Sequence, residues 1–113
     1  MTERLLQYIW QFQYFNKTSL QTVEGETVES VYQGSYNTNQ GPDFFEAKLK
    51  IANTLLVGNV ELHCKTSERN THKHSADKNY ANVIAHIVWE NDCTLPNNLP
   101  TIILQDRVSK ILL

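Results

Sequence analysis

A long β-hairpin is predicted by residues 44–65, which read FFEAKLKIANTLLVGNVELHCK. Apolar and polar residues alternate on both sides of Ala52-Asn53, a pair typical of a tight turn. Successive side chains of a strand point to opposite faces, so Glu61, His63 and Lys65 should share one face while the apolar residues between them share the other. The hairpin therefore carries a row of ionisable groups.

Pro42-Asp43 immediately precedes the first strand of this hairpin, and antiparallel pairing should bring Asp43 close to Glu61. Two carboxylates are ligands that Mg²⁺ or Mn²⁺ accepts, and such an ion can neutralise a phosphate. His63 or Lys65 could orient water or stabilise developing charge. The pattern predicts a metal-dependent phosphodiester site with Asp43 and Glu61 as metal ligands and His63 and Lys65 assisting. An ordinary polar sheet face, with a weak Glu61–Lys65 ion pair, remains the alternative.

The rest of the chain predicts a single α+β domain over residues 1–113, with an N-terminal helix and a mixed central β-sheet. Thr2-Glu3 can cap a helix whose apolar residues recur at helical spacing, and we expect that helix to be largely buried. Further elements are expected at 20–23, 27–32, 83–89 and 101–104 as strands, at 34–41 as a polar loop, at 76–81 as a short helix, and after Asp106 as a capped last turn.

Composition gives no general case for nucleic-acid binding, because the formal charge of the 113 residues is −2. The charge is unevenly distributed, however. From Lys48 to Lys78 there are six basic and three acidic residues, and three of the four histidines lie there. This segment favours an anionic partner such as nucleic acid, with an ordinary solvated surface of mixed charge as the alternative. Loop residues Gln40, His72 and His74 are candidate substrate contacts, the histidines to phosphate.

The two cysteines, Cys64 and Cys93, have no CxxC spacing and are expected to be free thiols in a reducing cytoplasm. No apolar run has membrane-spanning length, so a soluble cytoplasmic protein without a membrane partner is expected. The apolar residues 111–113 suggest a contact with a second copy or a covering domain.

The histidines offer a competing interpretation. The four histidines His63, His72, His74 and His86, together with Asp77 and Cys64, could form a transition-metal site, although their spacing matches no recognised zinc motif. For His86, which lies in an apolar run, a hydrogen-bonded core role is favoured over ligation.

Several motifs occur in an order that resembles the N-terminal part of the bacterial domain of unknown function 2851 family. They are Asn39-Gln40-Gly41-Pro42-Asp43-Phe44, Gly58-Asn59-Val60-Glu61-Leu62-His63 and Asn82-Val83-Ile84-x-His86-Ile87-Val88-Trp89. The resemblance implies that this chain corresponds to the first part of longer proteins, and by itself implies no activity.

A more distant similarity is to the PD-(D/E)xK nuclease-like superfamily. It implies a restriction-endonuclease-like core of helix, three-stranded meander, helix and strand, with Asp43 and Glu61 as its acidic positions. His63 stands at the lysine position, and Lys65 could substitute for that lysine from the same face. The leading hypothesis is therefore a Mg²⁺- or Mn²⁺-dependent nuclease-like domain. A non-catalytic interaction domain of a larger assembly is the main alternative.

Overall fold

The computed structural model describes residues 1–72, 82–94 and 99–110. Its elements, in chain order, are α1 (Glu3–Gln11), β1 (Val28–Tyr32), β2 (Ser35–Tyr36), β3 (Phe44–Ile51), β4 (Thr54–Lys65), α2 (Thr66–His72), β5 (Val83–Glu90), β6 (Thr101–Ile103) and the 3-10 helix η3 (Gln105–Arg107). The predicted α+β class and N-terminal helix are confirmed.

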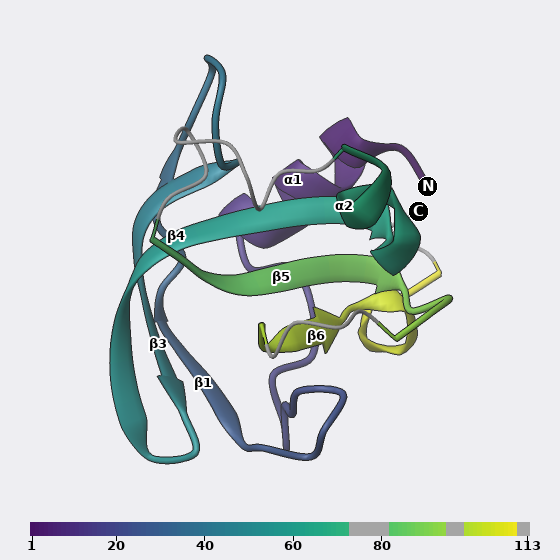
Figure 1. The fold of residues 1–113 in the computed structure, drawn as a ribbon. Coiled ribbons are helices and arrows are strands. Elements are labelled where there is room, and N and C mark those ends of the chain that lie inside the picture. Colours follow the sequence, from purple (N-terminus) through teal and green to yellow (C-terminus); the bar gives the residue numbers. More distant parts are fainter. Residues whose placement is uncertain (73–81, 95–98, 111–113) are drawn as a thin grey trace.

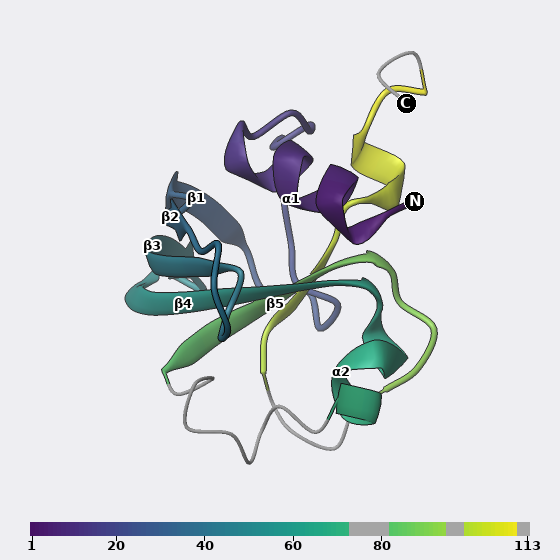
Figure 2. The same ribbon diagram turned by 90° about the horizontal axis from the view of Figure 1, so that it is seen from above.

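One mixed sheet organises the molecule, with strand order β1-β3-β4-β5-β6 and β2 paired to β3. The pairings β1–β3 and β3–β4 are antiparallel, whereas β4–β5 and β5–β6 are parallel. Figure 1 shows the sheet curling at the β1–β3 side, and Figure 2 shows α1 and α2 on opposite faces of it. The predicted mixed sheet is thus confirmed, and its central strands β4 and β5 lie between two helices.

Helix α1 begins where the sequence predicts, because the Thr2 Oγ1 accepts a hydrogen bond from the Leu5 amide at 3.1 Å. Leu6, Ile9 and Trp10 are fully buried against the sheet. The expectation of a largely buried helix is wrong for its aromatic flank, where Tyr8 and Phe12 are about half exposed at 48% and 50%.

Strand β3 contains a bulge that the alternation of its sequence did not predict. Strict alternation would place Phe45 on the core face with Ala47, but the register shifts between Phe44 and Ala47, and Glu46 has a φ of 55°. The side chain of Asn59 accepts the Glu46 amide at 3.2 Å, which holds the bulge from the neighbouring strand. Phe44 is consequently buried and Phe45 exposed.

The hairpin turn expected at Ala52-Asn53 is confirmed, and Gly58 marks a close approach of two neighbouring strands. Ala52 and Asn53 have φ values of 49° and 68°, as a two-residue hairpin turn requires. A Cβ at Gly58 would collide with the Ile84 side chain and would lie 2.7 Å from the Asn82 carbonyl. Only glycine therefore lets β4 and the start of β5 approach so closely.

Arg107 connects the two ends of the described chain. Its guanidinium donates to the carbonyls of Asn16 (3.0 Å), Thr18 (2.9 Å) and Ser19 (3.1 Å), and its own carbonyl accepts the Asn16 amide at 2.8 Å. Asp106 lies inside η3, whose cap position is Leu104, and the last turn predicted after Asp106 extends to Ile111, outside the described residues.

Smaller differences complete the comparison. Residues 20–23 form only an isolated bridge, Gln21 to Thr27, and the predicted loop 34–41 contains β2. The helix expected at 76–81 lies outside the described residues, whereas α2 occupies the residues directly after β4. No helix in the described ranges is both long and apolar enough to cross a bilayer.

Candidate functional site

Strand β4 places charged and apolar side chains on opposite faces, as its alternation predicts. Val60 and Leu62 enter the main hydrophobic core on the face that α1 covers. Glu61 and His63 point to the other face, where they are 0% and 1% exposed. Two ionisable groups are therefore buried at the centre of the sheet, a position that requires compensating partners.

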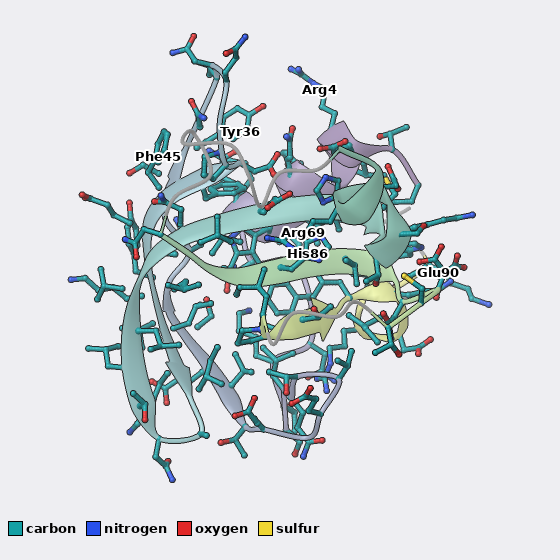
Figure 3. The ribbon with its side chains drawn as sticks, viewed as in Figure 1. Arg4, Tyr36, Phe45, Arg69, His86 and Glu90 are labelled. Atoms are coloured by element: carbon teal, nitrogen blue, oxygen red, sulfur yellow. The ribbon has the colours of Figure 1, made fainter. Side chains whose placement is uncertain are left out.

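Those partners come from α2 and β5. The Arg69 Nε lies 3.3 Å from the Glu61 Oε2, and the His63 Nδ1 lies 3.6 Å from the Glu61 Oε1. On β5, His86 is aligned with Glu61 in the parallel register, and its Nε2 lies 2.8 Å from the His63 Nδ1. Figure 3 shows Arg69 and His86 over the β4–β5 part of the sheet. The four side chains form one buried network.

The contact between the two imidazoles limits their protonation. A hydrogen bond between the His63 Nδ1 and the His86 Nε2 holds one proton, so one nitrogen donates and the other accepts. The accepting ring cannot carry its second proton at that nitrogen. At least one of the two histidines is consequently neutral while the contact persists. The favoured core role for His86 agrees with its complete burial and its bond to His63.

Asp43 lies where β3 begins, and its carboxylate continues the pairing of that strand with β4. Phe44 pairs with Val60, and the Asp43 Oδ2 accepts the Leu62 amide at 2.7 Å. The other oxygen, Oδ1, accepts the Gln7 Nε2 at 2.7 Å. The structure thus brings Asp43 to the residue that follows Glu61, at the edge of β4.

Lys65 and Gln40 are not brought to the buried network. The Lys65 side chain is 58% exposed, and its Nζ lies 3.9 Å from the Glu90 carboxylate at the far end of β5, labelled in Figure 3. Lys65 lies four positions after Glu61 along β4, which corresponds to about 13 Å of extended chain. Gln40 is exposed in the loop before β3, where its carbonyl accepts from the Asn37 amide group at 3.0 Å.

The structure does not describe the side chains of the two remaining predicted contacts, His72 and His74. His72 is the last residue of α2 and its side chain is not described, while His74 lies outside the described residues. In ranges 1–72, 82–94 and 99–110, no group of three or more His, Cys, Asp and Glu side chains that could hold a metal ion is found. Cys64 and Cys93 are both free thiols, as expected.

Two residues of this region were not identified from the sequence. A buried carboxylate on β4 implies a cationic partner, but nothing in the sequence selects Arg69 over the nearby lysines. Gln7 lies on the polar side of α1, and its contact with Asp43 spans 36 positions. Pairing at that distance depends on how the helix packs on the sheet.

Comparison with known proteins identifies a protein family but no characterised relative. No curated protein matches the chain, and no solved structure matches it. A family model described as "Protein of unknown function (DUF2851)" matches residues 3–113. The match covers nearly the whole chain, including the motifs around Asp43, Glu61 and His86. The chain therefore belongs to the DUF2851 family.

Proposed function

We propose that the region around Asp43 and Glu61 is a metal-dependent site for phosphodiester hydrolysis, with these two carboxylates as ligands of Mg²⁺ or Mn²⁺ and His63 assisting. The observation that carries the proposal is the 2.7 Å contact between the Asp43 Oδ2 and the Leu62 amide. It sets one carboxylate beside the strand residue that follows the other.

The donor atoms at this point suit a hard divalent ion. The N–H and C=O of one strand residue point to the same edge, so the Leu62 carbonyl faces the same side of β4 as its amide. That side carries Asp43, and each carboxylate oxygen can accept more than one bond. Oxygen-rich sites with one or two carboxylates are those that Mg²⁺ occupies. In this proposal Asp43, Glu61 and the Leu62 carbonyl would supply the oxygen ligands.

The order of elements is a second support. After α1, strands β1, β3 and β4 form an antiparallel meander, α2 follows, and β5 runs parallel to β4. This is the helix, meander, helix, strand order that the distant nuclease-like resemblance implies. In that arrangement the acidic positions fall at the start of β3 and in β4, where Asp43 and Glu61 lie.

The buried network has a chemical role in this proposal. When bound, a divalent ion would neutralise charge on the phosphoryl oxygens. The contact with Arg69 orients the Glu61 carboxylate. In this proposal the neutral ring of the His63–His86 pair accepts a proton from water, and the shared hydrogen bond holds the two rings in their relative orientation. Arg69 and His86 are positioning residues here.

The test is a Mn²⁺ titration that follows the melting temperature, paired with a cleavage assay on mixed single- and double-stranded nucleic acids. Wild type should be stabilised by about 2.7 kcal/mol when Mn²⁺ reaches a hundredfold excess over its dissociation constant. Asp43→Asn should lose both the stabilisation and the cleavage. Glu29→Gln, which removes an exposed carboxylate on β1, is the matched control and should keep both. A wild-type protein with neither metal stabilisation nor Mn²⁺-dependent cleavage refutes the proposal.

A further inference from the structure

We propose that the groove between α1 and β2 binds an unpaired nucleobase together with its phosphate, so that the substrate class of the site is single-stranded nucleic acid. This inference rests on the proposed function, because it assigns a substrate to the same site. It is carried by the residues of the groove and by their hydrogen-bonded connection to Asp43.

The groove is lined by two tyrosines, two glutamines and one arginine: Arg4, Gln7, Tyr8, Gln11 and Tyr36. Tyr8 comes from α1 and Tyr36 from β2, with exposed fractions of 48% and 38%. Figure 3 shows Arg4 and Tyr36 on the same side of the molecule, away from Glu90. Aromatic, amide and cationic groups are thus presented together to solvent.

Each of these groups matches a different part of a nucleotide. An exposed tyrosine ring offers a surface on which a base can stack whatever its sequence. Glutamine amides can bond the edge of a base, and the exposed Arg4 guanidinium can bond a phosphate. In a duplex the base faces are already stacked and their pairing edges are occupied. The groove therefore selects unpaired bases.

Each of the two tyrosine rings packs on a neighbouring aromatic ring. Tyr36 packs on the buried Phe44 with ring centroids 5.5 Å apart, and Tyr8 packs on Phe12 at 4.9 Å. A ring that is already held by neighbours loses less rotamer freedom when a base stacks on it. This support favours a binding role for the two tyrosines, because freely rotating surface side chains would lose more rotamer freedom on binding.

Gln7 connects the groove to the proposed metal site. Its Nε2 donates to the Asp43 Oδ1 at 2.7 Å, and its Oε1 accepts from the Tyr36 hydroxyl at 3.1 Å. These two bonds fix the orientation of the amide, and its second N–H hydrogen can reach a ligand. A base stacked on Tyr36 is consequently separated from the Asp43 carboxylate by one side chain. The phosphodiester attached to that base would lie beside the Asp43 carboxylate.

The test measures binding in the absence of metal, by fluorescence anisotropy with a labelled thymidine oligonucleotide and with a duplex of equal length, both in EDTA. Wild type should bind the single strand at least about tenfold more tightly than the duplex. Tyr36→Ala and Tyr8→Ala should each weaken single-strand binding by about 5- to 150-fold, the range for loss of one stacked base. Tyr36→Phe keeps the ring and should keep most of the affinity.

The matched control is Tyr32→Ala, which removes an equally exposed tyrosine (40%) from β1, where its hydroxyl contacts Ser35. It should change single-strand affinity by less than about twofold, the scale of a surface substitution away from the groove. Unchanged melting temperatures of the groove variants would show that lost binding is not lost folding. Duplex binding as tight as single-strand binding, or affinity unaffected by both tyrosine variants, overturns the inference.

Two further outcomes separate this inference from the proposed function. Tyr36-dependent single-strand binding without any Mn²⁺-dependent cleavage keeps the groove and refutes the nuclease. Cleavage that needs Asp43 but is unchanged in Tyr36→Ala keeps the nuclease and refutes the groove. Competition by thymidine monophosphate at the same concentration as the oligonucleotide would identify a free nucleotide as the ligand, which overturns the single-strand assignment.

Discussion

Replacing Arg69 with methionine should destabilise the protein strongly, because it leaves the Glu61 carboxylate buried without its cation. Glu61 is 0% and Arg69 8% exposed, and their closest contact is 3.3 Å. Removing one partner of a buried ion pair costs about 3–5 kcal/mol. We expect the lower end, about 3 kcal/mol, because this contact is longer than the optimum for a charged hydrogen bond and His63 lies 3.6 Å from the same carboxylate.

The assay is thermal and urea unfolding of Arg69→Met beside a matched control. For 113 residues, an unfolding entropy of about 2.1 cal/mol/K per residue gives about 0.24 kcal/mol/K. A loss of about 3 kcal/mol then lowers the melting temperature by about 13 °C. Lys65→Met breaks the exposed pair with Glu90 at 3.9 Å and should cost no more than about 1 kcal/mol.

A double variant identifies the cause of the loss. If an uncompensated charge destabilises Arg69→Met, then adding Glu61→Gln should restore stability instead of lowering it further. Two results would refute the reasoning: an Arg69→Met effect as small as that of Lys65→Met, or a double variant whose losses simply add. Either would mean that Glu61 is not held as a buried charge by α2.

The remaining predictions concern Gly58 and Cys64. Gly58→Ala should lower the free energy of unfolding by about 1–3 kcal/mol in urea titrations, because its Cβ would meet Ile84 and the Asn82 carbonyl. Gly25→Asn, at an open turn position with a φ of 89°, should stay within about 1 kcal/mol, and equal losses in the two variants would contradict this explanation. Burial, aided by the charges of Glu68 and Glu3, raises the pKa of the Cys64 thiol above its ordinary 9.0. In a Cys93→Ser background, iodoacetamide should therefore alkylate the folded protein more slowly than free cysteine at pH 8, with a rate that still rises beyond pH 9; a plateau below that pH would be inconsistent with the shift. Since the folded state holds this proton more tightly, the related stabilisation is complete below pH 9.0 and is lost as the pH rises through the pKa of the folded state.

Local features of the fold were predictable because neighbouring residues determine them. The cap at Thr2 and the turn at Ala52-Asn53 depend on side chains and backbone preferences within a few positions. The bulge at Glu46 was not predictable in this way. Its positive φ is unfavourable for glutamate on its own, and it is held by Asn59, thirteen positions away on another strand.

The candidate site likewise has one part that the sequence predicts and one part that it does not. Alternation in β4 is sufficient to put Glu61 and His63 on one face, and the hairpin brings Asp43 toward them. The contacts of His63 with His86 and of Glu61 with Arg69 depend on the parallel register of β5 and on where α2 begins. Neither property follows from a hydrophobic pattern, because both are set by how a crossover connection packs on the sheet.

The Arg107 guanidinium has a consequence for the order in which this protein can fold. The ribosome makes the loop after α1 before Arg107, the residue that binds its carbonyls and lies 88 to 91 positions later. At about 5–20 residues per second, that interval lasts roughly 5 to 18 seconds on the ribosome. Throughout it, the apolar face of Leu6, Ile9 and Trp10 lacks the full set of contacts that bury it in the finished molecule. The native position of α1 and the loop that follows it is therefore secured only after Arg107 has been synthesised.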